Sequence, residues 1–312
     1  MVISLVIPIF NEADNIPLLG RSIIRLAGEL SQHRFEAVLV DDGSTDGTSE
    51  IIAKLEPAKN ITWKMVQLSR NFGQQAAISA GISQAEGDVL IILDADLQDP
   101  PELIPAFLQK FSQGYEVVYG IRQDCKEALW KRFCCSAFYR LINALAERPI
   151  PLDAGDFSLI SKRVAKLIAG MPECDRFIRG MRNWVGFKQI GIPYERPKRW
   201  AGTSGYDWSR LFELALDGLW GFSKVPIRMA LLIGLAIVLL GGLYLVTACF
   251  NHLFIGGDAL PGWKLLIALG FMAVGANILV TSIVGEYVVR VYFQTKSRPL
   301  YVVEKVVTKA PG

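Results

Sequence analysis

Asp94 and Asp96, in the first third of the chain, have the spacing that metal-assisted chemistry needs. Asp94 and Asp96 directly follow the apolar run at residues 89–93, and Pro100 and Pro101 come shortly after them. The apolar run predicts a strand buried on both faces of a parallel sheet, and the prolines suit the first turn of a helix. Ligands of open α/β sheets bind beyond the carboxyl ends of the strands. Two carboxylates there are suited to hold Mg²⁺ or Mn²⁺ together with a diphosphate.

Acidic residues also follow two of the other predicted strands. Glu12 comes after the first strand, and Asp41 and Asp42 come after the second. An isolated Asp-X-Asp is commonly a solvated acidic loop, but carboxylates that converge from several strands repel one another unless a cation lies between them. Neither a Gly-X-Gly-X-X-Gly turn nor a Gly-Lys-Ser/Thr loop is present, which disfavours a dinucleotide or P-loop site. The pattern favours a site for a metal and a nucleotide.

Strands and helices alternate over the first 122 residues, which indicates an α/β fold with a parallel sheet. Apolar runs predict strands at residues 3–9, 35–40, 61–68, 89–93 and 116–120. Helical spacing predicts helices from residue 15 and at residues 49–55, 74–85 and 103–111. Further along we expect helices at 129–146, 164–169 and 177–184, and a strand near 153–160. Together these elements form a first domain, residues 1–206.

Composition disfavours several classes of site. The chain of 312 residues has a net charge of only +3, which gives no argument for a nucleic-acid partner. Its five cysteines are irregularly spaced, so we expect reduced thiols and neither a disulfide framework nor a zinc site. The two histidines have no partner at ligand spacing, which disfavours a histidine-based metal site or triad. The first residues predict a strand and no signal peptide.

Two long uncharged segments near the end of the chain predict a membrane hairpin. Residues 229–250 and 265–285 contain no charged side chain, and a helix as long as the first spans about 33 Å, enough to cross the hydrocarbon layer. Residues 208–222 mix apolar and charged side chains, as helices in the membrane interface do. A buried hairpin in a soluble protein is the alternative. We therefore predict an interfacial helix (207–228), a two-helix transmembrane hairpin (229–288) and a cytoplasmic tail (289–312).

The basic residues around this hairpin lie mostly on one side of it. They are Lys224, Arg228, Arg290, Lys296 and Arg298, against Lys264 in the connecting loop. The positive-inside rule then places the sheet domain and both termini in the cytoplasm. The sequence thus predicts a multi-pass protein of the inner, cytoplasmic membrane.

Two other segments have features suited to anionic groups. The predicted helix at 129–146 is basic and aromatic, so it could lie at a membrane surface or bind an anionic lipid head; an ordinary surface helix is the alternative. Arg132 and Ser136, four residues apart, share one face of it. A later loop combines Lys198 and Arg199 with glycines, as loops that fold over a phosphate do.

Together the motifs resemble the family 2 glycosyltransferases with a GT-A fold, specifically polyprenyl-phosphate glycosyltransferases of the bactoprenol glucosyltransferase and dolichol-phosphate mannose synthase type. The matching motifs are Val-Ile-Pro-Ile-Phe-Asn-Glu (6–12), Val-Asp-Asp-Gly-Ser-Thr-Asp-Gly-Thr (40–48), Ser-Arg-Asn-Phe-Gly (69–73), Asp-Ala-Asp-Leu-Gln-Asp-Pro (94–100), Gly-Ile-Arg (120–122), Gly-Asp-Phe-Ser-Leu (155–159) and Ala-Gly-Thr-Ser (201–204). The resemblance covers nearly the whole chain. It implies a Rossmann-like GT-A catalytic domain with a mostly parallel sheet.

The resemblance also implies roles for individual residues. A sugar nucleotide would contact Pro8, Phe10, Glu12, Val40, Asp41, Asp42, Asp94, Ala95 and Arg122. Mg²⁺ or Mn²⁺ would bind Asp96, Asp94 and Gln98, and the acceptor phosphate would contact Arg132, Ser136 and Arg140. Asp156 is the family's candidate catalytic carboxylate, beside Asp94 and Asp96, and Lys198, Arg199 and Ser204 would lie near the phosphates. Many relatives have lysine where this chain has Gly205, so Lys198 or Arg199 would replace it.

These features predict an inverting, metal-dependent hexosyltransferase that moves glucose from UDP-glucose onto undecaprenyl phosphate or another polyprenyl phosphate. The acceptor phosphate, with a second pKa of about 6, is largely ionised near neutral pH, so Asp156 would mainly orient the reactants. GDP-mannose, UDP-GlcNAc and an amino-arabinose donor are alternatives. A membrane-anchored protein that binds sugar nucleotides without turnover, and a membrane structural protein, are alternatives of other classes. Two transmembrane helices alone would bury little surface against each other, so a homo-oligomer is compatible with this architecture.

Overall fold

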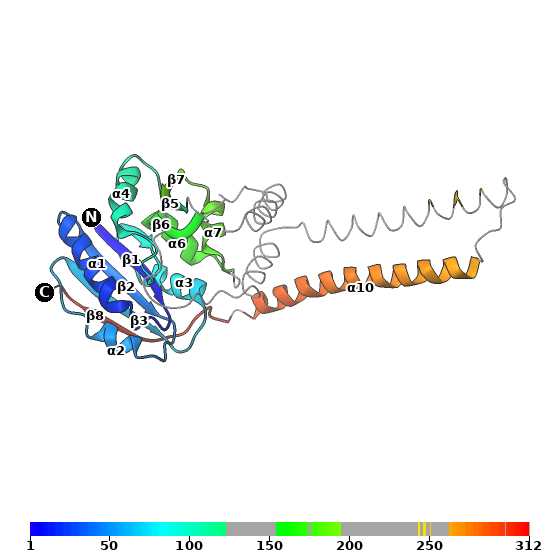
Figure 1. The fold of residues 1–312 in the computed structure, drawn as a ribbon, viewed down its shortest axis with the longest axis horizontal. Helices are drawn as coiled ribbons and strands as arrows, with labels where there is room; N and C mark the ends of the chain where they lie inside the picture. The colour runs from blue at the N-terminus through cyan, green and yellow to red at the C-terminus, as the bar shows by residue number, and fades with distance from the viewer. Residues whose placement is uncertain are drawn as a thin grey trace. The chain divides into compact units, whose positions relative to one another are not determined.

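The computed structural model describes residues 1–122, 154–173, 176–194, 262–296 and 298–311, with positions 243, 246, 247 and 250. The chain divides into two compact units, Met1–Leu211 with Pro299–Gly312, and Phe212–Arg298. The first unit holds a sheet and the helices that cover it (Figure 1). The predicted helix at 129–146, the interfacial helix and most of the first apolar span lie outside the described residues.

An eight-stranded sheet forms the centre of the first unit, in the order β7-β5-β6-β4-β1-β2-β3-β8. The strands are β1 (Val2–Ile9), β2 (Arg34–Asp41), β3 (Ile61–Leu68), β4 (Val89–Ile92), β5 (Val117–Arg122), β6 (Ala154–Ser161), β7 (Gln189–Tyr194) and β8 (Val303–Lys309). Only β6 and β8 run antiparallel to their neighbours. This arrangement confirms the predicted α/β class with a mostly parallel sheet.

Helices pack on both faces of the sheet. In the first unit they are α1 (Ile16–Glu29), α2 (Thr48–Ala53), α3 (Gln74–Gln84), the 3-10 turn η1 (Pro101–Leu103) with α4 (Ile104–Ser112), α6 (Lys162–Gly170) and α7 (Ile178–Val185). Pro17 and Pro101 stand in the first turns of α1 and η1, where a missing backbone N–H costs nothing. The predicted helix starts at these prolines are therefore confirmed.

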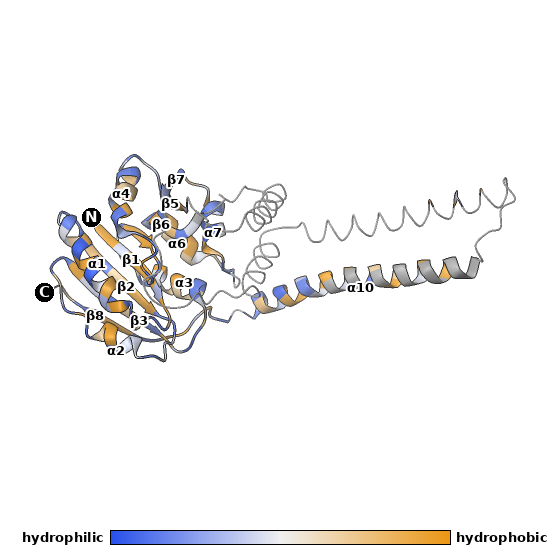
Figure 2. Cartoon of the chain, viewed as in Figure 1, coloured by the Kyte–Doolittle hydropathy of each residue, from blue (hydrophilic) through white to orange (hydrophobic). Residues whose placement is uncertain are grey.

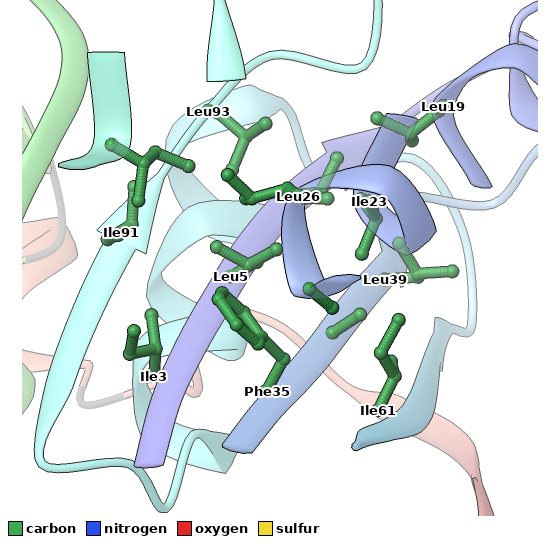
Figure 3. Close-up of a cluster of buried hydrophobic side chains, with 14 of the residues drawn as sticks. Ile3, Leu5, Leu19, Ile23, Leu26, Phe35, Leu39, Ile61, Ile91 and Leu93 are labelled. Carbon is green, nitrogen blue, oxygen red and sulfur yellow. The ribbon is translucent and has the colours of Figure 1, made fainter. Parts of the chain in front are cut away.

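The main core joins α1 to the central strands. Ile23 and Leu26 of α1 are buried in one cluster with Leu5 of β1 and Leu39 of β2 (Figure 3). Each such side chain stabilises the fold by roughly 1.5–3 kcal/mol relative to an exposed one. The central strands are hydrophobic along their length (Figure 2), because helices cover both of their faces.

Helix α3 packs against the opposite face of the sheet and approaches it closely. Ala77 and Ala80 form a second buried cluster with Val40 of β2. A Cβ atom on Gly81 would lie 2.4 Å from Val6 Cγ1, so a larger residue would force the helix away from β1. The small residues of α3 therefore set the position of its first turn, which points two glutamines into the site described below.

The end of the chain returns to the sheet as β8. Val306 of β8 pairs with Val66 of β3, and Lys309 Nζ donates to the carbonyl oxygen of Leu55, beyond α2, at 3.0 Å. The sequence analysis predicted a cytoplasmic tail over residues 289–312 and did not identify this strand. The pairing has no local signal, because the partner strand lies far away in the chain and β8 itself is half exposed.

A long helix, α10 (Gly262–Thr295), makes up most of what is described of the second unit. It includes residues 265–285, the second predicted membrane span. Within the described residues, no helix combines the length and the apolar character needed to cross a membrane. The transmembrane hairpin therefore stays a prediction.

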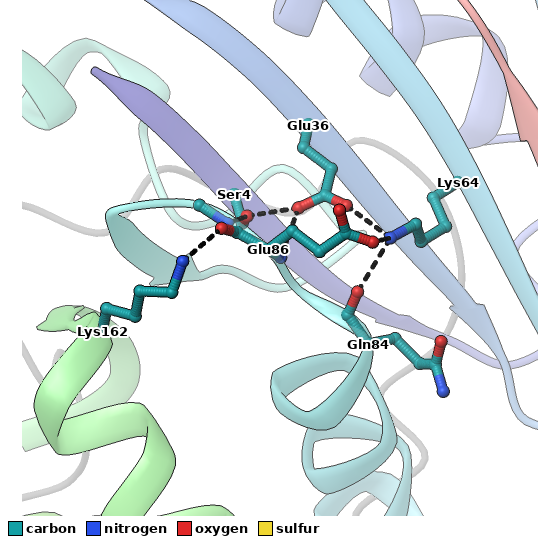
Figure 4. A network of polar contacts seen from close by, with 7 residues as sticks. Ser4, Glu36, Lys64, Gln84, Glu86 and Lys162 are labelled. Carbon is teal, nitrogen blue, oxygen red and sulfur yellow. Dashed lines mark hydrogen bonds and ion pairs between the residues drawn. The ribbon is translucent and has the colours of Figure 1, made fainter.

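A polar network, in which Glu36 and Lys64 are buried and Glu86 is exposed, ties the connection between α3 and β4 to the sheet. Lys64 Nζ lies 2.7 Å from Glu36 Oε1 and 2.7 Å from Glu86 Oε1, and the Ser4 hydroxyl donates to Glu36 (Figure 4). Burial by itself lowers the pKa of Lys64, but hydrogen bonds and charge attraction to the two glutamates outweigh burial and raise it. The network lies near the amino ends of the strands, away from the acidic edge.

Candidate active site

The loops after β1 and β2 interlock at the carboxyl edge of the sheet. Asn11 N–H donates to Ser44 Oγ at 3.0 Å, and Thr45 N–H donates to Asn11 Oδ1 at 2.9 Å. Glu12 N–H donates to Thr48 Oγ1 at 3.1 Å. Both loops leave the sheet at one edge because β1 and β2 are parallel. The residues predicted to bind a nucleotide from these loops therefore lie in one connected region.

The residues predicted to hold the nucleotide base are neighbours at this edge. Pro8 of β1 pairs in register with Val40 of β2. Phe10, just beyond β1, is 45% exposed, and Glu12 is half-buried. An exposed aromatic ring beside two buried strand ends provides a surface on which a base can stack.

Asp42 joins this region to the turn at residues 69–73. Its Oδ1 accepts a hydrogen bond from Phe72 N–H and its Oδ2 accepts one from Gly73 N–H, both at 2.8 Å. Burial raises the pKa of Asp42 despite these two hydrogen bonds. The carboxylate therefore positions the backbone of the turn, and its contact with a nucleotide stays a prediction.

Asp41 organises the loop after β2 itself. It is fully buried, and it accepts hydrogen bonds from Ser44 N–H at 2.9 Å and from the Ser49 hydroxyl. Gly43 has a φ of +72°, and a Cβ atom there would lie 2.6 Å from the carbonyl carbon of Arg70. The Asp-Asp-Gly-Ser motif thus packs two loops against each other, a role that the sequence did not predict.

Asp94 and Asp96 follow β4 at the same edge. Gln74 Nε2, at the first residue of α3, donates to Asp94 Oδ1 at 3.0 Å. Gln98 N–H donates to Asp96 Oδ1 at 3.1 Å, and Ala95 between the two acids is buried. The three predicted metal ligands are therefore held close together on one short segment.

Asp99 and Tyr194, which we did not predict as site residues, hold this segment in place. Asp99 Oδ2 accepts a hydrogen bond from Asp94 N–H at 3.1 Å, and Asp99 Oδ1 accepts one from the Tyr194 hydroxyl at 3.0 Å. Both side chains are buried. Asp99 belongs to a motif already noted and could have been found there. Tyr194, the last residue of β7, has no such signal because it is distant in sequence.

Asp156 lies near the start of β6, beside the end of β4. The two strands are antiparallel, with Ile92 paired to Ser158. Arg179 of α7 binds the carboxylate through two parallel contacts, Nε to Oδ1 at 2.8 Å and Nη2 to Oδ2 at 3.0 Å. Asp156 is only 4% exposed, so this pair is largely shielded from solvent.

Consecutive glutamines at the start of α3 connect the acids of β4 and β6. Gln74 Nε2 contacts Asp94 as described, and Gln75 Nε2 lies 3.4 Å from Asp156 Oδ2. Two predicted catalytic acids that are separated by a long stretch of chain are thus hydrogen-bonded to adjacent residues of α3. Sequence reasoning missed both glutamines, although they directly follow the Ser-Arg-Asn-Phe-Gly motif.

A second arginine of α7 is buried near Asp156. Arg182 is 3% exposed, and its guanidinium carbon lies 5.0 Å from the centre of the Tyr119 ring. Burial lowers the pKa of Arg182 to about 10, against the attraction of Asp156. Arg182 therefore remains charged near neutral pH and adds positive potential to this side of the site.

The comparison with known families decides the class of protein. The sequence model described as Glycosyl transferase family 2 matches residues 4–168, which include the acids after β1, β2, β4 and at the start of β6. The chain belongs to glycosyl transferase family 2. The predicted family is therefore confirmed, and the protein is a glycosyltransferase.

Relatives extend this family assignment over nearly the whole chain. The uncharacterised glycosyltransferase YkcC of Bacillus subtilis (strain 168) is 36% identical over 306 residues, 97% of this chain and 93% of the relative. A prophage bactoprenol glucosyl transferase homolog of Escherichia coli (strain K12) is 35% identical over 308 residues, 98% of this chain and 99% of the relative. A solved structure of glucosyl-3-phosphoglycerate synthase from Mycobacterium tuberculosis with Mn²⁺, UDP and phosphoglyceric acid is 17% identical, with a TM-score of 0.45, over 69% of this chain and 75% of that one.

The oxygen ligands of this family 2 glycosyltransferase fit a hard divalent cation. In the described ranges, no group of three or more His, Cys, Asp or Glu comes together as a metal site. Mg²⁺ commonly binds through one or two carboxylates and the phosphates of a substrate, without a closed protein cage. Asp94 and Asp96 on one segment fit such an ion, because a diphosphate would supply the remaining ligands.

Arg122 completes the described part of the predicted site. It is the last residue of β5 and pairs in register with Tyr194, so it lies at the same edge of the sheet. The other predicted residues lie outside the described part of the chain: Arg132, Ser136, Arg140, Lys198, Arg199, Ser204 and Gly205.

Proposed function

We propose that this glycosyltransferase is an inverting, metal-dependent hexosyltransferase that uses UDP-glucose as donor and a polyprenyl phosphate, such as undecaprenyl phosphate, as acceptor. The observation that carries the proposal is that Asp94 and Asp156 are hydrogen-bonded to adjacent residues of α3, Gln74 and Gln75. The choice of glucose and of a polyprenyl lipid is supported by the E. coli relative, whose description names a bactoprenol glucosyl transferase.

On the donor side, the edge of the sheet binds the sugar nucleotide. Phe10 stacks on the base, and Asp94 and Asp96, with Gln98 beside them, hold Mg²⁺ or Mn²⁺ at the diphosphate. When bound, the cation neutralises the charge that develops on the leaving nucleoside diphosphate. Arg122, at the end of β5, adds a positive charge at the same edge.

On the acceptor side, little proton transfer is needed. A phosphate monoester has a second pKa of about 6, so its oxygen is largely ionised near neutral pH and can attack directly. Both oxygens of Asp156 already accept hydrogen bonds from Arg179. Asp156 therefore orients the sugar or the attacking oxygen instead of removing a proton. Attack in line with the leaving group inverts the anomeric carbon, so an α-linked donor gives a β-linked lipid phosphate.

The lipid acceptor requires a site next to a membrane. The uncharged segments at 229–250 and 265–285, with basic residues on their flanks, support a hairpin that anchors the sheet domain at the cytoplasmic face of the inner membrane. The family resemblance supports Arg132, Ser136 and Arg140 as the residues that bind the lipid phosphate, and Lys198, Arg199 and Ser204 as residues for the donor phosphates. A homo-oligomer is compatible with this anchor.

The test is a transfer assay with the purified full chain. Radiolabelled UDP-glucose, undecaprenyl phosphate and Mg²⁺ should give a labelled lipid, and EDTA should abolish it until Mg²⁺ or Mn²⁺ is added in excess. Parallel reactions with GDP-mannose, UDP-GlcNAc and an amino-arabinose donor identify the sugar. Donor binding without transfer from any donor would instead indicate a sugar-nucleotide-binding protein.

A further inference from the structure

We infer that Arg179 and Gln75 are positioning residues that act on the reaction through Asp156, by holding its carboxylate in one orientation at the site. The inference rests on the proposed function, in which Asp156 orients the reactants. Neither residue belongs to the motifs that carry the family resemblance, and both were found from contacts between elements that are distant in sequence.

Arg179 contacts both carboxylate oxygens of Asp156. The guanidinium fork donates through Nε and Nη2 to the two carboxylate oxygens at 2.8 and 3.0 Å. Two parallel contacts prevent rotation of the carboxylate, which a single contact would allow. The Asp156 side chain is 5% exposed and the Arg179 side chain is 27% exposed, so solvent screens the pair only from the arginine side.

Gln75 helps to place α7, the helix that carries Arg179. Gln75 Oε1 accepts a hydrogen bond from Ile178 N–H at 2.9 Å, at the first residue of α7. The other end of the same amide, Nε2, lies 3.4 Å from Asp156 Oδ2. One side chain of α3 thus contacts both the carboxylate and the residue directly before Arg179. Gln75 therefore sets the spacing between Asp156 and its arginine.

Two arginines of α7 contribute positive charge near Asp156. Arg182 is buried on the same helix, and its attraction to Asp156 is opposed by its repulsion from Arg179. Arg179 binds the carboxylate directly, and Arg182 adds a second positive charge on the same helix. With its oxygens oriented by Arg179 and Gln75, Asp156 is suited to accept a hydrogen bond from a substrate hydroxyl.

A double-mutant cycle on the full chain tests the inference. The variants are Arg179→Gln, Asp156→Asn and the double variant, and the assay measures kcat and the KM values for UDP-glucose and undecaprenyl phosphate. We expect Arg179→Gln to lower kcat roughly 100-fold, because misplacing a positioning group by about 1 Å has that effect. The KM for UDP-glucose should change little, and the double variant should be no slower than Asp156→Asn alone. Independent effects that multiply in the double variant would overturn the inference.

Two further variants separate positioning from a general structural role. Arg179→Lys keeps one charged contact and should recover part of the kcat lost in Arg179→Gln. Gln75→Leu should lower kcat, as Arg179→Gln does, and leave the KM for UDP-glucose near its original value. Equal loss of kcat and of donor affinity in both variants would indicate a damaged fold and would contradict the inference.

Arg176 provides a matched control three residues before Arg179. Its Nη1 donates to the Ile168 carbonyl oxygen at 3.1 Å and its Nη2 to that of Ala169 at 3.3 Å, so it holds the end of α6. Arg176→Gln should lower the melting temperature and leave kcat within about twofold. No transfer by the unmodified chain would overturn the proposed function as well, whereas normal transfer by Arg179→Gln would overturn this inference alone.

Discussion

The hydroxyl of Tyr194 donates a hydrogen bond to Asp99 Oδ1 at 3.0 Å. This contact joins the end of β7 to the segment that carries the predicted metal ligands, because Asp99 also accepts a hydrogen bond from the backbone of Asp94 at 3.1 Å. The Tyr194 ring packs edge-on against Phe157, with ring centres 5.8 Å apart. Tyr194, on the edge strand β7, thus supports the position of Asp94.

Tyr194→Phe should weaken this support while keeping the ring in place. A buried acceptor that loses its donor costs about 1–3 kcal/mol, so we expect the free energy of unfolding to fall by that amount. The transfer rate should also fall, because Asp94 is less firmly held. Denaturant unfolding and the transfer assay measure the two effects. Tyr115→Phe is the control, since the Tyr115 ring contacts Lys188 and lies outside this chain of hydrogen bonds. Equal stability of the two variants would contradict the role assigned to Tyr194.

Asp94→Asn and Asp96→Asn should each abolish most of the metal-dependent transfer. Loss of a cation ligand removes several kcal/mol of charge stabilisation, which corresponds to a fall in kcat of roughly 100-fold or more. The remaining activity should need a higher Mg²⁺ concentration, which a titration after EDTA treatment measures. Asp88→Asn is the matched control at the amino end of the same strand, where Asp88 accepts a hydrogen bond from Val2 N–H. An unchanged Mg²⁺ requirement in both site variants would exclude them as ligands.

Gly81→Ala should destabilise the fold by overpacking α3 against the sheet. The added methyl group would lie 2.4 Å from Val6 Cγ1 and 3.1 Å from Val40 Cγ2. Such overpacking lowers the free energy of unfolding by about 1–3 kcal/mol. Gly28→Ala in α1 is the control, because a methyl group there meets nothing within 4 Å and should add up to about 1 kcal/mol through helix propensity. Denaturant unfolding of both variants gives the comparison, and a gain in stability for Gly81→Ala would refute the close approach.

Asp46 should make a pH-dependent contribution to stability. Partial burial raises its pKa, but hydrogen bonds from Thr48 and from the backbone N–H of Ala13 outweigh burial and lower the pKa from its usual 3.8. A lowered folded-state pKa means that the contribution is present above about pH 4 and is lost as pH falls through the folded-state value. Asp46→Ala should therefore cost under about 1 kcal/mol at pH 7, because the side chain is exposed, and less in acid.

The measurement for Asp46 is denaturant unfolding at several pH values. The stability difference between the original chain and Asp46→Ala should shrink as the pH is lowered below about 4. Asp14→Ala, which removes an exposed acid in the neighbouring loop, is the control. A difference for Asp46→Ala that grows in acid would contradict the assigned hydrogen bonds.

Much of the sheet could be predicted from the sequence. The strands β1 and β4 are apolar along their length because helices cover both faces of a parallel sheet, and their ends could be located from the residues that follow. The strand β8 could not be predicted, because its partner β3 is distant in sequence and half of its residues face solvent. Edge strands of this kind have a weak apolar pattern.

The site was predictable only in part for a similar reason. Asp94, Asp96 and Asp156 could be selected because each stands next to an apolar strand or in a short motif. Gln75 and Arg179 could not be selected, since a glutamine at a helix start and an arginine in a helix are common on protein surfaces. Their relation to Asp156 depends on contacts between α3, β6 and α7.

The sequence by itself determined the α/β class, the acidic ends of the strands and the family, because burial patterns and short motifs are local properties of the chain. Only the tertiary structure decided which side chains hold those acids. Tyr194 reaches Asp99 from an edge strand of the sheet, and Arg179 of α7 reaches Asp156 of β6. Such contacts depend on strand order and on how closely the helices pack. Neither can be deduced from the residues near each acid in the sequence.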